Sequence, residues 1–142
     1  MEWLPKNTTT HQDHVIAHVI GTTVFGYFIL EETLYLLLDI GFIWTVYLDG
    51  EMGLLPHPVA IGELEVEEQV RREIRADVDL LLRDGFGAHG LTRIMSPTVN
   101  CFITEVSFFS HDDRRRLLIT GEDESLAIET SLTTGEVKLV EI

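Results

Sequence analysis

The densest hydrophobic pattern of the chain runs from residue 23 to residue 48, where Glu31, Glu32 and Asp39 are the only charged residues. β-Branched and aromatic side chains fill most of the other positions, and these residue types favour strands. The charged residues and the glycine at position 41 mark natural turns. We therefore predict three antiparallel strands, over residues 23–30, 34–39 and 42–49.

This hydrophobic run lacks the features of a membrane segment. A spanning helix needs about 20 consecutive apolar residues, and glycines and threonines interrupt the run before that length is reached. Asp39 would lie inside any second span, which is costly in lipid. We therefore expect the run to form the centre of a soluble sheet, with no membrane association.

Both faces of the predicted meander are apolar. In the strand over 42–49, Trp44 and Val46 share one face, while Ile43 and Thr45 share the other. A sheet that is apolar on both faces must be covered on both faces. A single helix can cover only one of them, so a second cover is required.

Helical periodicity occurs in two segments of the chain. The first, over residues 10–20, begins with Thr10 in a capping position and Asp13 three residues later. The second, over residues 64–84, has an apolar stripe with a spacing of four residues. Its members are Val66, Val70, Ile74, Val78 and Leu82. We predict a short helix for the first segment and a long helix for the second.

The C-terminal part returns to alternating, strand-like patterns with hairpin turns between them. Four further strands are predicted, over residues 100–109, 116–121, 125–132 and 136–142. The fold class is therefore α+β: a curved, mainly antiparallel sheet of about seven strands packed on the long helix over 64–84. Residues 1–142 are expected to form a single domain, with residues 1–9 as a flexible or loosely attached tail.

Charge restricts the classes of partner. The chain of 142 residues has a formal net charge of −14, which argues against nucleic acid or an anionic membrane as a partner, because phosphate contacts need clustered cations. The basic cluster at 114–116 is preceded directly by Asp112 and Asp113. Cys101 is the single cysteine, and the N-terminal residues lack the pattern of a signal peptide. A cytoplasmic location is expected.

Three histidines form the clearest candidate metal motif. His11, His14 and His18 would lie near one face of a helix, and the last two have the i,i+4 spacing that can bind one ion. No further ligand is evident from the sequence, so a solvated or capping stripe is the alternative. We assign no metal and no cofactor.

Two further groups of residues invite a chemical interpretation. His111, Asp112 and Asp113 have the composition of an acid–base or phosphate site, and the alternative is a polar loop with solvated ion pairs. Cys101 has the chemistry of a nucleophile if a histidine lies beside it, but its place at the start of an apolar strand favours the core. Catalytic residues therefore stay unassigned.

A set of aromatic side chains can line a ligand cavity if the sheet bends around an open space. A filled core is the alternative. The set comprises Tyr27, Tyr35, Phe42, Trp44 and Tyr47.

No nucleophile-elbow, phosphate-loop or dinucleotide-binding motif occurs, and no family resemblance is identified. We therefore expect a non-enzymatic protein-interaction or regulatory domain that self-associates as a homodimer. The alternative is a small-molecule- or metal-binding protein, or an enzyme, that uses the aromatic cavity or the stripe of His11, His14 and His18.

Overall fold

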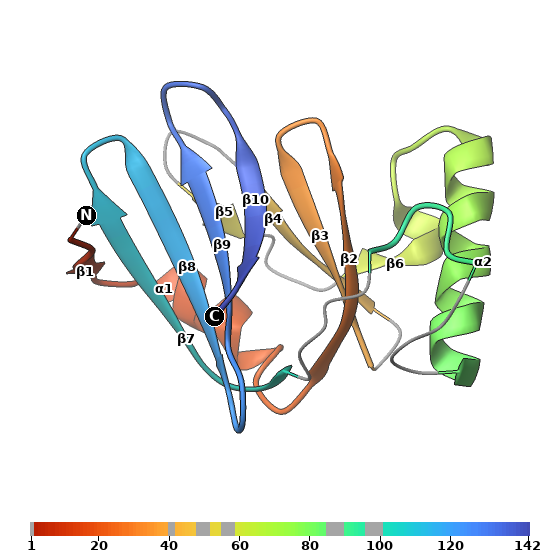
Figure 1. The fold of residues 1–142 in the computed structure, drawn as a ribbon, viewed down its shortest axis with the longest axis horizontal. Helices are drawn as coiled ribbons and strands as arrows, with labels where there is room; N and C mark the ends of the chain where they lie inside the picture. The colour runs from red at the N-terminus through yellow and green to blue at the C-terminus, as the bar shows by residue number, and fades with distance from the viewer. Residues whose placement is uncertain (1, 40–41, 48–51, 55–58, 85–89, 96–100) are drawn as a thin grey trace.

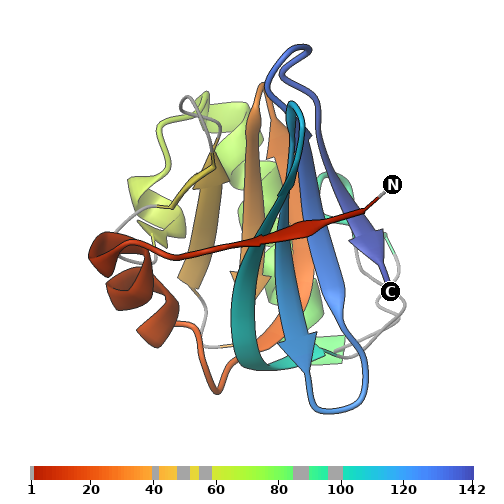
Figure 2. The same cartoon turned by 90° about the vertical axis from the view of Figure 1, so that its left-hand side faces the viewer.

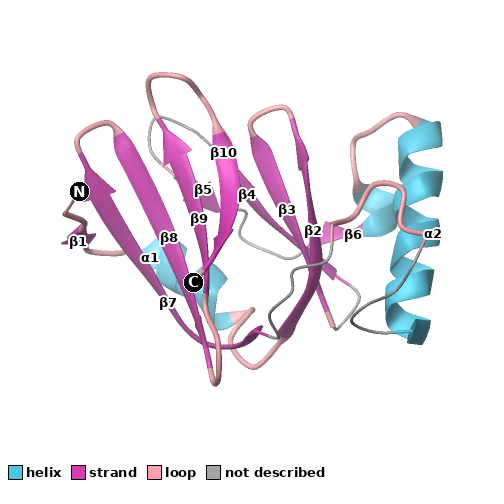
Figure 3. Cartoon of the chain, in the orientation of Figure 1, coloured by secondary structure: helices cyan, strands magenta, loops and turns pink. Residues whose placement is uncertain are grey.

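The computed structural model describes residues 2–39, 42–47, 52–54, 59–84, 90–95 and 101–142. Within these ranges the fold is α+β, with a mainly antiparallel sheet of ten strands and two α-helices (Figures 1 and 3). Neither helix is long and apolar enough to span a bilayer in the part of the chain described.

The elements follow one another in a strand–helix–strand–helix–strand order. They are β1 (Leu4–Lys6), α1 (Thr10–Ala17), β2 (Thr23–Leu30), β3 (Thr33–Leu38), β4 (Phe42–Tyr47), β5 (Gly53–Leu54), β6 (Val59–Ala60), the 3₁₀ turn η1 (Ile61–Glu63), α2 (Glu68–Asp84), β7 (Cys101–His111), β8 (Arg114–Gly121), β9 (Leu126–Ser131) and β10 (Val137–Glu141).

The strands form one open sheet in the order β10-β9-β8-β7-β2-β3-β4-β5, with β1 on β7 and β6 on β4. β7 joins the two halves, because its first residues pair with β2 and the rest of it pairs with β8 and β1. Figure 1 shows α2 on one side of β2–β4 and the strands β7–β10 on the other. The two halves of the sheet approach each other, and β10 contacts β3.

Each of the seven predicted strands is present, with ends that differ by a few residues; positions 48, 49 and 100 lie outside the described residues. The count of about seven was too low because β1, β5 and β6 have only two or three residues, too few to show alternation. Residues 4–6, expected to belong to a loose tail, pair with β7, with Leu4 opposite Ser110. Figure 2 shows β1 lying against this part of the sheet.

Both helices are shorter than predicted. The N-cap of α1 is Thr9, whose side chain accepts a hydrogen bond from the backbone of Gln12 in a capping box, so the predicted cap at Thr10 was one residue late. α2 begins at Glu68 rather than at 64. The residues before it are held in a non-helical path, because the Arg71 guanidinium donates to the Leu64 carbonyl oxygen at 2.5 Å.

Two hydrophobic cores lie on the two sides of β2–β4. The helix core, between these strands and α2, contains Phe28, Leu37, Ile43, Leu64, Ile74, Val78, Leu81 and Ile94. The main core lies on the opposite side and is enclosed by β7–β10 and α1; Leu36, Trp44 and Ile119 are among its fully buried members. The chain itself therefore covers both apolar faces of the meander.

The buried face of α2 differs from the predicted stripe at its C-terminal end. Residues four apart advance 400° around a helix with 100° per residue, so such a stripe drifts by about 40° at each step. Leu82 is consequently 50% exposed, while Leu81 is buried. Asp77 also lies on the buried face and is fully buried.

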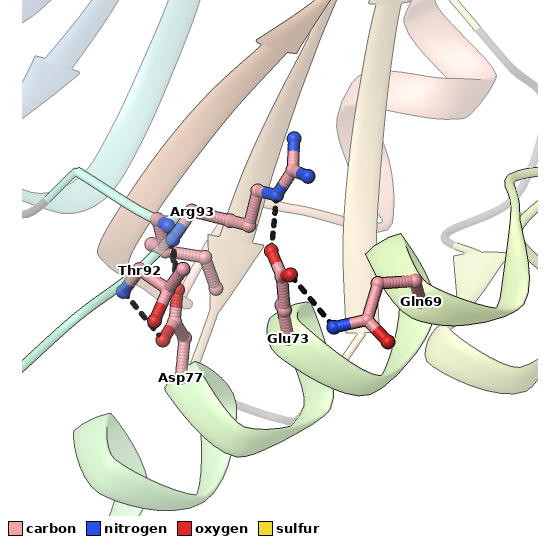
Figure 4. Close-up of polar contacts among 6 residues, drawn as sticks. Gln69, Glu73, Asp77, Thr92 and Arg93 are labelled. Carbon is pink, nitrogen blue, oxygen red and sulfur yellow. Dashed lines mark hydrogen bonds and ion pairs between the residues drawn. The ribbon is translucent and has the colours of Figure 1, made fainter.

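Asp77 fixes α2 to the segment over residues 90–95 (Figure 4). Its carboxylate accepts backbone N–H groups of Thr92 at 2.9 Å, Arg93 at 2.6 Å and Ile94 at 2.8 Å. The same segment exchanges backbone hydrogen bonds with β2 through Met95. One buried carboxylate thus ties the helix, the segment and the sheet together.

Two contacts support this connection. Arg93 forms an ion pair with Glu73 at 2.6 Å, and Glu73 also accepts from Gln69 at 3.0 Å (Figure 4). These hydrogen bonds, with that from Gln69 having the largest effect, lower the pKa of Glu73. On β2, a Cβ atom at Gly26 would collide with the side chain of Ile94, so glycine permits the close approach.

Replacing Asp77 with alanine is expected to lower the free energy of unfolding by about 3 kcal/mol, because three backbone N–H groups, one of them buried and two partly buried, lose their acceptor. The matched control is Asp79→Ala on the exposed face of α2, with an expected effect below about 0.5 kcal/mol. Urea denaturation followed by circular dichroism measures both. Equal losses in the two variants would contradict the role assigned to Asp77.

Candidate binding groove

A row of side chains crosses the helix-facing side of β2–β4. Phe28 lies opposite Tyr35, and Tyr35 lies opposite Thr45 in the strand register. α2 itself begins at Glu68, so the chain beside this row is the non-helical path between η1 and α2. The row is therefore covered less completely than the row that contains Leu37, which lies in the helix core.

Two hollows of about 370 Å³ each open beside this row and share Tyr35 and Glu65, so they form one groove, called here the Tyr35 groove. The first hollow is lined by Leu30, Glu31, Thr33, Tyr35, Glu65, Val66, Glu67 and Val70. The second is lined by Tyr35, Thr45, Val59, Glu63, Leu64 and Glu65.

Tyr35 forms the junction between the two hollows. Its ring stacks on that of Phe28, with centroids 4.7 Å apart and an angle of 8° between the ring planes. Burial raises the pKa of Tyr35, and the charges of Glu31 and Glu65 raise it further. The phenol therefore stays neutral at physiological pH and presents an aromatic surface beside two carboxylates.

Thr45 is the least satisfied polar group of the groove. It is 5% exposed, it lines the second hollow, and its hydroxyl has no hydrogen-bond partner in the described part of the chain. A buried hydroxyl without a partner costs about 1–3 kcal/mol. Trp44 and Thr130 also have unpartnered buried groups, but they line neither hollow. The Thr45 oxygen atom has less than 1 Å² of accessible surface, so the unpartnered hydroxyl is a cost to stability and not a contact point for a ligand.

The rim of the groove is acidic. Glu31 lies in the β2–β3 turn, and Glu63, Glu65 and Glu67 lie along the path from η1 to α2. Their side chains form no hydrogen bond or ion pair with any residue that the structure describes. Among the residues that the structure describes, neither lining contains a histidine, cysteine or serine. The groove therefore offers apolar contact and negative charge, which are features of a binding site.

The predicted histidine stripe is divided by the fold. His11 Nε2 lies 3.2 Å from the Leu54 carbonyl oxygen of β5, whereas the rings of His14 and His18 contact each other edge to face at 5.2 Å. Among the described residues, no group of three histidine, cysteine or acidic side chains is placed to hold a metal ion. Of the three, His11 is thus shown to contact β5 from α1.

The His111–Asp113 stretch and its arginines form structural ties. His111 Nδ1 lies 2.8 Å from the Glu2 carbonyl oxygen, and Arg116 pairs with buried Glu129 at 2.6 Å while lying over the Trp3 ring at 4.8 Å. Hydrogen bonds, first from Thr133 and then from Ser131, lower the pKa of Asp113. These contacts hold the N-terminal strand and the hairpin turns in place.

Cys101 lies in the main core, where its Sγ atom is 3.8 Å from the Ile119 carbonyl oxygen. Burial raises the pKa of the thiol to about 11. A thiol that stays protonated at neutral pH is a poor nucleophile. Cys101 therefore serves as a packing residue of the main core.

One of the five predicted aromatic side chains, Tyr35, lines the groove. Trp44 is fully buried in the main core, Tyr27 packs against that core, and Phe42 is 41% exposed. Sequence reasoning missed Thr45, although Thr45 shares a strand face with Ile43, which placed a hydroxyl on an apolar face. It also missed Glu63, Glu65 and Glu67 as a rim, because part of that segment was assigned to the long helix.

Comparison of the chain with family models, with curated proteins and with solved structures yields no match. The function of the groove must therefore be inferred from its own geometry.

Replacing Thr45 with valine is expected to raise the free energy of unfolding by about 1 kcal/mol, because it removes a buried hydroxyl without a partner. Thr22→Val is the matched control: Thr22 is also buried, but its hydroxyl donates to the Val19 carbonyl oxygen at 2.7 Å. The control should lose about 1 kcal/mol. Urea denaturation measures the free energy of unfolding of both variants. Equal losses of this free energy would mean that the Thr45 hydroxyl has a hydrogen-bond partner in solution.

The Cys101 thiol is expected to resist Ellman's reagent at pH 8 in the folded protein and to react fully in urea. Because folding raises its pKa from 9.0 to about 11, the neutral thiol is favoured in the folded state, and stability is lost as pH rises through this window. The difference in free energy of unfolding between the wild type and Cys101→Ala should therefore fall between pH 9 and 11. A constant difference would contradict this assignment.

Proposed function

We propose that this chain is a non-enzymatic binding domain that holds an extended segment of a partner protein in the Tyr35 groove. The observation that carries the proposal is the groove itself: two hollows of about 370 Å³ each meet at Tyr35, whose ring stacks on that of Phe28 and lies near the charges of Glu31 and Glu65.

The shape of the groove favours a segment of a chain over a small molecule. Small-molecule sites enclose most of the surface of their ligand. Here the first hollow lies beside the β2–β3 turn, the second continues from Tyr35 across β4 to β6, and both are open to solvent on one side. A ligand that spans both would extend past Tyr35 and keep one side exposed, as a peptide segment does.

The lining residues support a binding role rather than catalysis. Acid–base or nucleophilic catalysis needs a reactive group with a partner that activates it. The polar groups of the groove are glutamates, threonines and a tyrosine whose pKa is raised. These groups can orient and neutralise a ligand.

Self-association as a homodimer and a cytoplasmic location stay predictions. The first was expected because the second apolar face of the meander needed a cover, and the main core provides that cover within the chain. A second copy is therefore one partner among others that the groove can accept. The single buried thiol of Cys101 suits a reducing compartment.

Peptides selected from a random-sequence library against the wild type are expected to bind Tyr35→Leu more weakly, because Tyr35 lines both hollows. Loss of its aromatic surface should weaken binding about threefold to tenfold. Thr22→Val, a substitution outside the groove, is the control and should keep wild-type affinity. Fluorescence polarisation measures the affinities. Selected peptides that bind both variants like the wild type would refute the groove as the binding site.

A further inference from the structure

A hollow with a positively charged lining lies on the side of α2 that carries Arg71, Arg72 and Arg75, and it is called here the arginine hollow. Its volume is about 380 Å³, and Gly62 of η1 and Glu68 also line it. Residues three and four apart occupy one face of a helix, which explains why these arginines meet there. In the part of the chain described, no residue of this lining belongs to the Tyr35 groove, so the two features are separate.

The arginine hollow carries more positive charge than its own carboxylate can balance. Arg71 Nη1 lies 3.1 Å from one Glu68 oxygen, and Arg72 Nε lies 3.5 Å from the other. One carboxylate therefore serves two guanidinium groups. With Arg75 included, three positive charges and one negative charge line the hollow, which leaves an excess of two positive charges. The whole chain has a net charge of −14, so this excess is local.

The side chain of Arg75 is directed toward the hollow instead of a carboxylate on its own helix. Asp79 stands four residues later on α2, which is the spacing of a helical ion pair. Among the residues that the structure describes, however, Arg75 forms no hydrogen bond or ion pair. Its Nη2 atom lies 3.8 Å from the point that a Cβ atom of Gly62 would occupy. The guanidinium therefore extends toward η1, where it is exposed to an incoming anion.

The other two arginines differ in how firmly they are held. Arg71 Nη2 donates to the Leu64 carbonyl oxygen at 2.5 Å and Nη1 donates to Glu68, so this side chain, 28% exposed, forms a fixed wall. Arg72 and Glu68 are 73% and 63% exposed and lie farther apart. Exposed ion pairs of this kind contribute little to stability. An anion can therefore draw Arg72 from Glu68 at little cost.

We infer that the arginine hollow binds a phosphate group with two negative charges, either as inorganic phosphate or as a phosphate monoester. This inference does not rest on the Tyr35 groove. A phosphate monoester carries nearly two negative charges at neutral pH, which matches the excess in the hollow. Its terminal oxygens accept several N–H groups at once, and the planar fork of a guanidinium fits them in pairs. A carboxylate offers one charge and two oxygens, so it would engage only part of the lining.

The overall charge restricts the source of this phosphate. Nucleic acids and anionic membranes present many phosphates together, and a chain with a net charge of −14 repels such a surface. A single phosphate group enters the local excess without bringing a larger anionic surface with it. A small phosphorylated molecule or one phosphorylated side chain is therefore the form of ligand that the charges favour.

Titration of ¹⁵N-labelled protein with inorganic phosphate, capped phosphoserine or capped glutamate at constant ionic strength, followed by NMR, tests the site. Phosphoserine should bind with a Kd of about 1 mM, with shifts centred on Arg72 and Arg75. Glutamate should bind at least about tenfold more weakly. Tighter binding of phosphoserine than of inorganic phosphate identifies a monoester site, and the reverse identifies a site for the free ion. Glutamate within twofold of phosphoserine, or shifts that do not saturate for either phosphate, would overturn the inference.

A first pair of variants separates the site from the overall charge. Arg75→Gln and Arg83→Gln each remove one positive charge at an exposed position of α2. Arg83 pairs with Asp84 at 3.3 Å and is not among the residues that line the hollow. Arg75→Gln should weaken phosphoserine about fivefold to tenfold, and Arg83→Gln should stay within about twofold of the wild type. Equal losses would show attraction by the overall charge alone and would overturn the site.

A second pair of variants should strengthen binding at one position. Glu68→Gln and Glu122→Gln each remove one negative charge, but only Glu68 competes with a ligand for Arg71 and Arg72. Glu122 is exposed after β8. Glu68→Gln should tighten phosphoserine about twofold to fivefold, and Glu122→Gln should leave it unchanged. Equal affinities in these two variants would place the ligand elsewhere and would overturn the inference.

Discussion

The apolar character of both faces of the β2–β4 meander is the constraint on which the rest of the structure depends. A sheet of this kind is stable only when both faces are removed from water. α2 covers one face and forms the helix core with Leu37 and Ile43, and the C-terminal strands with α1 enclose Trp44 on the other. The order of the sheet follows from this, because β7 must leave β2 to bring β8–β10 across the second face.

The groove exists because the cover on the helix side is incomplete. α2 is anchored near its middle by Asp77, whose carboxylate binds three backbone N–H groups. Its first residue is Glu68, so the chain before it passes the row of Tyr35 and Thr45 without the side-chain density of a helix. The same arrangement that stabilises the helix core therefore leaves Thr45 with an unpartnered hydroxyl.

The charges of the chain fall into two groups with different roles. Arg116 with Glu129, and Arg93 with Glu73, form short ion pairs that hold elements together. The glutamates of the groove have no such partners among the described residues. The net charge of −14 therefore combines paired and unpaired carboxylates. In the groove, unpaired carboxylates lie beside an aromatic and apolar surface.

The sequence by itself determined the long strands, the presence of both helices and the place of Cys101 in the core, because alternation and helical periodicity are local properties that survive in any tertiary context. The tertiary structure alone decided the short strands, the start of α2 at Glu68 and the division of the histidines. It also decided the roles of Asp77 and Thr45. A buried carboxylate and a surface one look alike in a pattern of polar positions, and only contacts between distant segments decide which polar groups find partners and which do not.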